Sequence, residues 1–262
     1  LQERAGALLI ELDETAAAIA SGGDRPRGRL RISAPLLFSQ TAMGKLAAGF
    51  SLKYPEVRME VTTEDRPVDM VEEGYDLVIR VNPDPDESLV GRAFLRDGSV
   101  VVAAPHLAYD SRATVPVVIR GTPGQTRSWT MNTPTGQLSL QIDPVLSLSS
   151  MTMVRDAVRM GVGAARLPLS LVSHDLAVGR LVRWGDVEGP ETVLWALYPS
   201  RRLLSARVSA FLDYLKQAFP LGTADELAAM SRNNFEGVTL LAGATSKDPR
   251  SRSGRFIRRG FS

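Results

Sequence analysis

Hydrophobic and polar positions alternate between strand and helix patterns over residues 29–104. Apolar residues that alternate with polar ones, or short apolar runs, predict three strands: residues 30–33, 57–63 and 75–81. Apolar residues at helical spacing, together with the positions of proline, predict two helices: residues 36–53 and 67–73. This order of strands and helices predicts an α/β fold on a largely parallel sheet.

Two further strand-like runs, residues 89–95 and 99–104, flank the dipeptide Asp97-Gly98. Such a dipeptide between strands is typical of a tight hairpin turn. The sequence therefore predicts that these two runs pair with each other.

Residues 105–219 repeat the alternation of strands and helices. Strand patterns occupy residues 115–120, 138–142, 145–150 and 191–200, and the run GRLVRW (179–184) precedes the last of them. Helical patterns occupy residues 152–160, 168–178 and 201–219. Breaks in the pattern near residues 105–114 and 185–190 are the expected crossings between two subdomains.

The first twenty residues carry a heptad-like apolar seam. Its positions are Leu1, Ala5, Leu8, Leu12, Thr15 and Ile19. The interpretation that we favour is a linker helix of residues 1–22 that dimerises through Leu1, Leu8, Leu12 and Ile19; a helix packed on its own domain is the alternative. The glycines and proline of residues 21–28 end this helix.

The composition is that of an ordinary globular protein: 262 residues, of which 44% are hydrophobic and 23% charged. Cysteine is absent, which excludes disulfides, thiolate nucleophiles and cysteine-bound zinc and suits a reducing cytosol. No apolar run approaches the ~18 residues of a membrane span, and the N-terminus lacks the basic region of a signal peptide. We therefore expect a cytoplasmic protein without a membrane partner. Because it begins with Leu, we interpret the chain as a piece of a longer one.

The positive charge is concentrated at the C-terminal end. The net charge is +2, and residues 221–262 carry seven basic against four acidic residues, or +3, so residues 1–220 carry −1. A slightly acidic body offers no surface for the phosphates of DNA. Residues 220–262, rich in Ser, Gly and Arg towards their end, are predicted to be a disordered tail.

Signals of catalysis are weak. The two histidines, His106 and His174, lie far apart, so they do not indicate a metal site. No nucleophile elbow, phosphate loop or dinucleotide-binding glycine pattern accompanies any other residue. We expect no metal, no cofactor and no enzymatic activity.

Several stretches, in a fixed order over residues 1–219, resemble one protein family. They are GRLRISAP (28–35), FSLKYPEV (50–57), EEGYDLVIR (72–80), DESLVGR (86–92), RDAVRMGVG (155–163), RLP (166–168), VGRLV (178–182) and YPSRRLL (198–204). Together they resemble the effector-binding region of the LysR-type transcriptional regulators.

This resemblance implies a two-lobed α/β fold like that of the type 2 periplasmic binding proteins. The lobes would comprise residues 29–104 with 191–219, and residues 105–190. A small-molecule effector would bind between them, and a helix-turn-helix domain ahead of Leu1 would bind DNA in a homodimer or tetramer.

The junction between strand 30–33 and the following helix is the first candidate site. Ligands of open α/β sheets bind at the carboxyl ends of strands, beside helix N-termini that present unpaired N–H groups. Ser33, Ala34 and Pro35 therefore form a candidate anion site. The alternative is that Ser33 only caps its own helix.

The same reasoning selects residues at the ends of other strands. They are Thr63, Glu64, Asp65, Arg66 and Arg80 in the first lobe, and Ser149, Ser150, Met151 and Arg166 in the second. The arginines could bind a carboxylate of the effector or form ordinary salt bridges.

The sequence thus favours the ligand-sensing domain of a regulator that binds a small, carboxylate-bearing effector. A solute-binding protein of a transport system with the same fold is the first alternative, and an enzyme built on this fold is the second.

Overall fold

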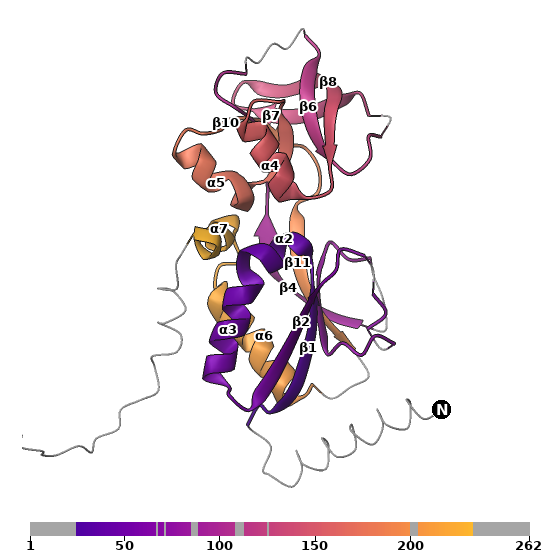
Figure 1. Cartoon of the computed structure of the whole chain (residues 1–262), viewed down its shortest axis with the longest axis vertical. Helices are drawn as coiled ribbons and strands as arrows, with labels where there is room; N and C mark the ends of the chain where they lie inside the picture. Colours follow the sequence, from indigo (N-terminus) through magenta and orange to yellow (C-terminus); the bar gives the residue numbers. More distant parts are fainter. Residues whose placement is uncertain are drawn as a thin grey trace, which may run out of the picture.

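The computed structural model describes residues 25–66, 68–70, 72–84, 89–107, 113–124, 126–199 and 204–232. These residues form two lobes, each built on a mixed β-sheet with helices packed against it (Figure 1). The two-lobed α/β fold predicted from the sequence is confirmed. The predicted linker helix, with Leu1, Leu8, Leu12 and Ile19, lies outside the described residues.

The first lobe contains a five-stranded sheet in the order β2-β1-β3-β11-β4. The strands are β1 (Gly28–Ala34), β2 (Val57–Thr63), β3 (Leu77–Val81), β4 (Leu89–Asp97) and β11 (Thr192–Pro199). Strand β1 is parallel to β2 and β3, whereas β11 is antiparallel to β3 and β4. The prediction of a largely parallel sheet is wrong, because β11 returns from the second lobe and pairs in the opposite direction.

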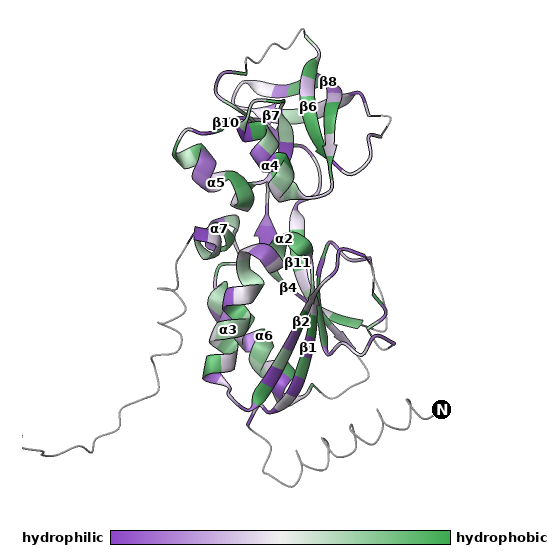
Figure 2. Cartoon of the chain, viewed as in Figure 1, coloured by the Kyte–Doolittle hydropathy of each residue, from purple (hydrophilic) through white to green (hydrophobic). Residues whose placement is uncertain are grey.

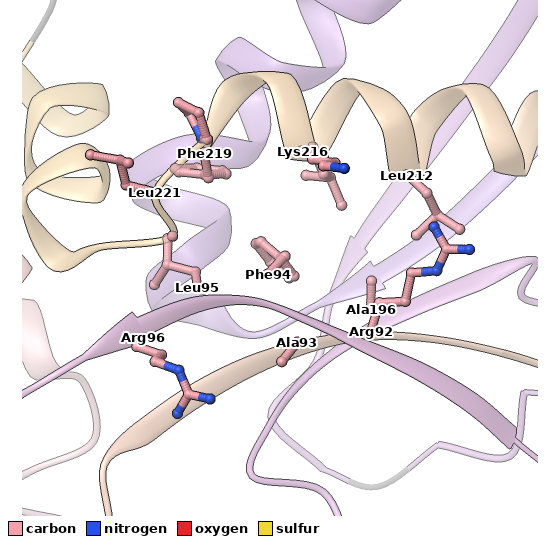
Figure 3. Close-up of a pocket in the computed structure, with 13 residues that line it drawn as sticks. Arg92, Ala93, Phe94, Leu95, Arg96, Ala196, Leu212, Lys216, Phe219 and Leu221 are labelled. Carbon is pink, nitrogen blue, oxygen red and sulfur yellow. The ribbon is translucent and has the colours of Figure 1, made fainter.

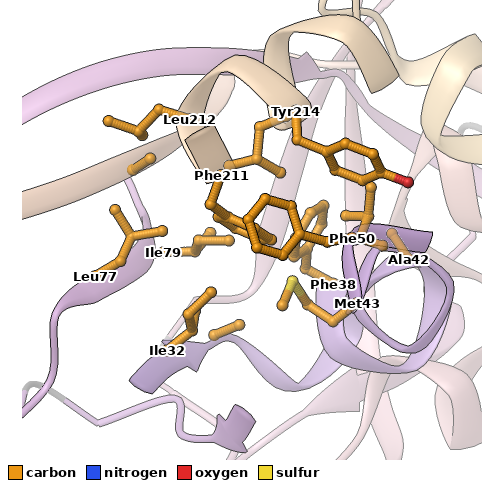
Figure 4. Close-up of a cluster of buried hydrophobic side chains, with 14 of the residues drawn as sticks. Ile32, Phe38, Ala42, Met43, Phe50, Leu77, Ile79, Phe211, Leu212 and Tyr214 are labelled. Carbon is orange, nitrogen blue, oxygen red and sulfur yellow. The ribbon is translucent and has the colours of Figure 1, made fainter. Parts of the chain in front are cut away.

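A continuous helical segment follows β1, as predicted for residues 36–53. It consists of α2 (Leu36–Phe38), the π-helical turn η1 (Ser39–Met43) and α3 (Gly44–Lys53). With α6 (Ala206–Ala218) it covers one face of the sheet, where Phe50 packs edge-on against Phe211 and Tyr214 (Figure 4). This aromatic cluster is the centre of the first lobe's core.

Strand β1 alternates because its two faces have different environments. Leu30 and Ile32 are fully buried in the core beneath the helices. On the other face, Arg31 stacks on Tyr75 and donates to the carbonyl of Glu73. Hydrophilic residues accordingly recur among hydrophobic ones along β1 and β2 (Figure 2). The described residues of segment 64–76 therefore cover this second face in place of helices.

The second lobe contains a six-stranded sheet in the order β6-β8-β7-β10-β5-β9. Its elements are β5 (Ser99–Ala103), β6 (Val115–Arg120), β7 (Ser128–Thr133), β8 (Gly136–Leu148), β9 (Ala165–Pro168), β10 (Val182–Val187), α4 (Met151–Arg159) and α5 (Leu169–Ala177). Only β6 and β8 are parallel among the described pairs of this sheet. Strand β8 unites the two short strands predicted over residues 138–142 and 145–150.

The predicted hairpin at Asp97-Gly98 is wrong. Strand β4 pairs with β11 in the first sheet, whereas β5 pairs with β9 and β10 in the second. Gly98 is therefore the first crossing between the lobes, and the expected boundary at residues 104–105 moves to Gly98. The second crossing, residues 188–191, lies close to the expected break. Asp97 pairs with Thr192, so the two crossings leave the first lobe side by side.

Two other predictions differ from the structure. The described residues of segment 67–73 form turns rather than a helix. Part of the predicted disordered tail is a helix, α7 (Ala224–Arg232), because Leu227 and Ala228 are buried. Helix α7 packs between η1 of the first lobe and α5 of the second (Figure 1). Residues 233–262 lie outside the described residues.

Candidate functional site

The carboxyl ends of β1 and β2 lie side by side because the two strands are parallel. Ala34 is in register with Thr63, and the N–H of Glu64 donates to the carbonyl of Ala34 at 3.0 Å. The fold thus brings the predicted junction, Ser33 to Pro35, together with the predicted group of residues 63–66. Both groups lie at the end of the sheet from which α2 begins.

The start of α2 already holds a carboxylate of its own chain. Pro35 is the N-cap residue in an extended conformation, and the first helical N–H, that of Leu36, donates to Oδ1 of Asp65 at 2.9 Å. A carboxylate at a helix N-terminus is stabilised by the unpaired N–H groups and the positive end of the helix dipole. At the predicted anion site, Asp65 already accepts the first N–H group of the helix.

Ser33 does not cap the helix that follows it. Its side chain is completely buried, and its Oγ accepts a hydrogen bond from a terminal nitrogen of Arg80 at 3.0 Å. The interpretation of Ser33 as a cap is wrong, because the serine lies within the strand and its side chain is on the face opposite to α3. Its role is to hold the Arg80 guanidinium.

Arg80 is half-buried on β3 and has only uncharged partners. Its guanidinium donates to Ser33 and, at 2.7 Å, to the carbonyl of Ile79. Burial lowers the pKa of Arg80, and the neighbouring carboxylates Glu64 and Glu73 act in the opposite direction without fully offsetting it. Among the described residues, no carboxylate forms an ion pair with Arg80. A partly desolvated guanidinium that has neighbouring carboxylates but no ion pair can still receive an anionic group.

Arg66, by contrast, has its counter-ions within its own loop. Two of its nitrogens contact the carboxylate of Glu73, each at 3.0 Å, and a third lies 3.3 Å from Glu64. The hydrogen bonds with Glu73 raise the pKa of Arg66. The ordinary salt bridge, one of the two readings of this residue, is therefore present.

In the second lobe, the ends of β6 and β8 lie together because these strands are also parallel. Arg120, the last residue of β6, is in register with Leu148, and Ser149, Ser150 and Met151 follow. The Oγ of Ser150 accepts the N–H of Thr152 at 3.3 Å, so Ser150 caps α4. Ser149 is exposed at the same end of the sheet.

The strand ends of the first lobe and those of the second lobe are in contact across the boundary between the lobes. A terminal nitrogen of Arg120 donates to Oδ2 of Asp65 at 3.0 Å. Nearby, Leu37 of α2 packs against the core of the second lobe, to which Met151 also contributes. Arg120 was not selected from the sequence, although it ends a predicted strand and the rule applied to Arg80 identifies it equally well.

Arg166 lies elsewhere in the second lobe. Its guanidinium lies over the ring of Trp129 at 5.4 Å from the ring centre, and burial lowers its pKa. Its neighbours in β9, Ala165 and Leu167, belong to the core beneath α4 and α5, so Arg166 is on the opposite face of the sheet. No contact of the described residues joins it to the Asp65–Arg120 pair.

The described residues give no sign of a metal centre or a membrane segment. They contain no group of three or more histidine and acidic side chains placed to hold a metal ion. None of their helices is both long and apolar enough to traverse a lipid bilayer. The site thus contains cations, N–H groups and carboxylates of the chain itself at the lobe boundary.

Comparison with known proteins identifies the family. The model of the LysR substrate binding domain matches residues 23–220. The HTH-type transcriptional regulator PtxR of Pseudomonas aeruginosa is 30% identical over 226 residues, which are 80% of this chain and 70% of that protein. The probable HTH-type transcriptional regulator LtrA of Klebsiella pneumoniae is 27% identical over 225 residues, 80% of this chain and 72% of that protein.

Solved structures agree on the fold. The regulatory domain of CrgA from Neisseria meningitidis superposes with a TM-score of 0.62 at 22% identity, covering 74% of this chain and 100% of that domain. Full-length AphB, a virulence activator of Vibrio cholerae, superposes with a TM-score of 0.62 at 21% identity, covering 83% of this chain and 77% of that protein. The chain belongs to the LysR family of transcriptional regulators and contains its substrate-binding, or effector-binding, domain.

Proposed function

We propose that this domain senses a small effector bearing a carboxylate, which binds between the lobes with its anionic group on Arg80. The observation that supports this most directly is the desolvated Arg80 guanidinium. It is held by Ser33 and lacks an ion-pair partner among the described residues. A carboxylate of the effector would supply the missing counter-charge through a charge-assisted hydrogen bond.

Asp65 determines how such an effector changes the domain. Its carboxylate holds the N–H of Leu36 in the first lobe and Arg120 in the second. An effector with a second anionic group that reaches these donors would compete with Asp65 for them, and binding of that kind and the Asp65–Arg120 pair would exclude each other. The effector would therefore shift the population from one arrangement of the lobes to another.

The wider role follows from the family. The relatives are described as HTH-type transcriptional regulators, which favours regulation over solute transport or catalysis. We propose that in the full-length, cytoplasmic protein this domain is joined to a helix-turn-helix domain, forms a homodimer or tetramer, and controls DNA binding through the arrangement of its lobes.

The test begins with a thermal-shift screen of small aliphatic and aromatic carboxylates. The best compound is then titrated calorimetrically into the wild type and two variants, Arg80→Gln and Arg58→Gln. Arg58 is an exposed arginine on β2 that serves as the matched control. We expect at least tenfold weaker binding for Arg80→Gln and unchanged binding for Arg58→Gln.

Equal affinity of wild type and Arg80→Gln would overturn the proposed site. If a chemically broad screen finds that only uncharged compounds bind, the proposal that the effector bears a carboxylate is wrong. The melting temperature of each variant, measured without ligand, separates loss of binding from loss of folding.

A further inference from the structure

A separate groove lies in the first lobe, and one of its ends, at Arg96 and Gly222, is close to the first crossing between the lobes. It is formed by the edge strand β4, helix α6 and the turn after α6, and its volume is about 560 Å³ (Figure 3). Pockets for small molecules are commonly about 300–1,000 Å³. The groove is therefore large enough for a ligand of its own.

A β-bulge gives the groove its apolar floor. The register between β4 and β11 shifts so that Phe94 is an extra residue between Ala93 and Leu95. Phe94 and Leu95 consequently both contribute to the core on the α6 side, although consecutive residues of a regular strand would point to opposite faces. The Phe94 ring lies 5.9 Å from that of Phe219, and Leu215 is also buried there.

The turn after α6 closes one end of the groove. The carbonyl of Gly222 accepts the N–H of Arg96 at 2.8 Å, which attaches the turn to the edge of β4. Gly222 has a φ of +64°, and a Cβ at this position would lie 2.8 Å from the carbonyl oxygen of Phe94. The close approach of the two backbones therefore requires a glycine here.

The rim of the groove is positively charged. Arg92 extends from β4 towards α6, which contributes Lys216, whereas Arg96 extends to the other side of the strand (Figure 3). Arg96 forms an ion pair with Glu191 at 3.0 Å. Among the described residues Arg92 and Lys216 have no such partner, and no acidic residue lines the groove. The groove thus combines an apolar floor with two uncompensated cations.

We propose that this groove is a second ligand site, for an amphipathic carboxylate. The apolar body of the ligand rests on Phe94 and Phe219, and its carboxylate is bound by Arg92 and Lys216. Burial of the apolar body supplies most of the affinity, and the two cations select an anionic head over a neutral one. This site does not depend on the proposed effector site at the lobe boundary.

The probe is decanoate, titrated calorimetrically into the whole chain below its aggregation concentration. Decanol, which lacks the charge, and acetate, which lacks the apolar body, are the matched compounds. We expect saturable binding of decanoate at one site, at least tenfold weaker binding of decanol, and no binding of acetate. The doubly substituted variant Arg92→Gln/Lys216→Gln should bind decanoate at least tenfold more weakly and decanol unchanged.

Control variants and an NMR measurement test whether decanoate binds in the groove. Arg80→Gln and Arg58→Gln should bind decanoate like the wild type, and the methyl signals of Leu212 and Leu215 should shift in NMR spectra as decanoate is added. Loss of decanoate binding in Arg80→Gln with unchanged binding in the groove variant would place the ligand at the lobe boundary and overturn the proposal. Unsaturable binding, or methyl signals that do not move, would overturn it as well.

Discussion

The carboxylate of Asp65 accepts a hydrogen bond from Arg120, in the other lobe, at 3.0 Å. Its second oxygen caps α2 at the N–H of Leu36. Both members of the ion pair are more than one third exposed, and pairs of this kind contribute about 0–1 kcal/mol to stability. The pair is therefore better suited to select an arrangement of the lobes than to stabilise the fold.

The first prediction concerns this pair. If an effector carboxylate competes with Asp65, the substitution Asp65→Asn should increase its affinity several-fold, because the competing negative charge is removed. Arg120→Gln should change the melting temperature little. Calorimetric titration of the best carboxylate from the screen measures the first effect. Asp186→Asn, which removes an exposed ion pair with Arg183 in the second lobe, is the control. Weaker binding to Asp65→Asn would show that Asp65 contacts the effector favourably.

A second prediction compares two arginines of α4. Arg159 donates to both oxygens of Asp175, each at 2.6 Å, and Asp175 is only 1% exposed. Arg159→Ala leaves a buried carboxylate with Arg180 as a distant partner, 3.8 Å away. We expect a loss of about 3–5 kcal/mol in the free energy of unfolding.

The matched variant for this experiment is Arg155→Ala. Arg155 pairs with the exposed Asp156 on the same helix, so its loss should cost less than about 1 kcal/mol. Urea denaturation of both variants gives the comparison. Similar losses in the two would show that the burial of Asp175 does not strengthen its ion pair.

A third prediction concerns Asp97, which is buried at the first crossing between the lobes. Its carboxylate accepts the hydroxyl of Ser170 at 2.5 Å and the N–H of Ser170 at 3.2 Å. Burial raises the pKa of Asp97, and these hydrogen bonds only partly offset the effect. The folded protein therefore holds this proton to a higher pH than the unfolded chain does.

This raised pKa makes the free energy of unfolding depend on pH. The contribution of Asp97 to the free energy of unfolding should decrease as the pH rises from about 4, the value for an unfolded chain, through the raised pKa. Relative to Asp97→Asn, the wild type should lose stability over this range. Urea denaturation at several pH values measures the difference in stability between the wild type and Asp97→Asn. Asp143→Asn, at an exposed position on β8, is the control for removal of a solvent-exposed carboxylate. A difference that stays constant or grows with pH would contradict the raised pKa.

A fourth prediction tests whether α7 belongs to the folded domain. Leu227 is 3% exposed and is part of the first lobe's core. Leu227→Ala should lower the free energy of unfolding by about 2–5 kcal/mol. Leu221→Ala, at a position that is 80% exposed, should change it by less than about 0.5 kcal/mol in denaturation experiments. Equal effects would indicate that α7 contributes no burial.

Local patterns were sufficient to predict most of the elements. Strand 57–63 was predicted with its observed bounds, because one-sided burial imposes an alternation that is visible in a short window. Pairing between strands is not local. Asp97-Gly98 has the sequence of a hairpin turn, but β4 and β5 find better partners more than sixty residues away, in β11 and β9.

In the candidate site too, local sequence predicted the positions of residues but not their partners. Strand ends and helix starts indicated where Ser33 and Asp65 would lie. Their partners depend on register: Arg80 reaches Ser33 because β3 is parallel to β1, and Arg120 reaches Asp65 only once the lobes are placed together. Helix α7 was missed because it buries only Leu227 and Ala228, which are too few to form a pattern over nine residues.

The two connections between the lobes leave the first lobe as neighbours, at Asp97 and Thr192, and enter the second through the paired strands β5 and β10. Two neighbouring connections restrict the relative movement of the lobes more than a single connection would. A molecule that contacts both lobes at their boundary would restrict this movement further.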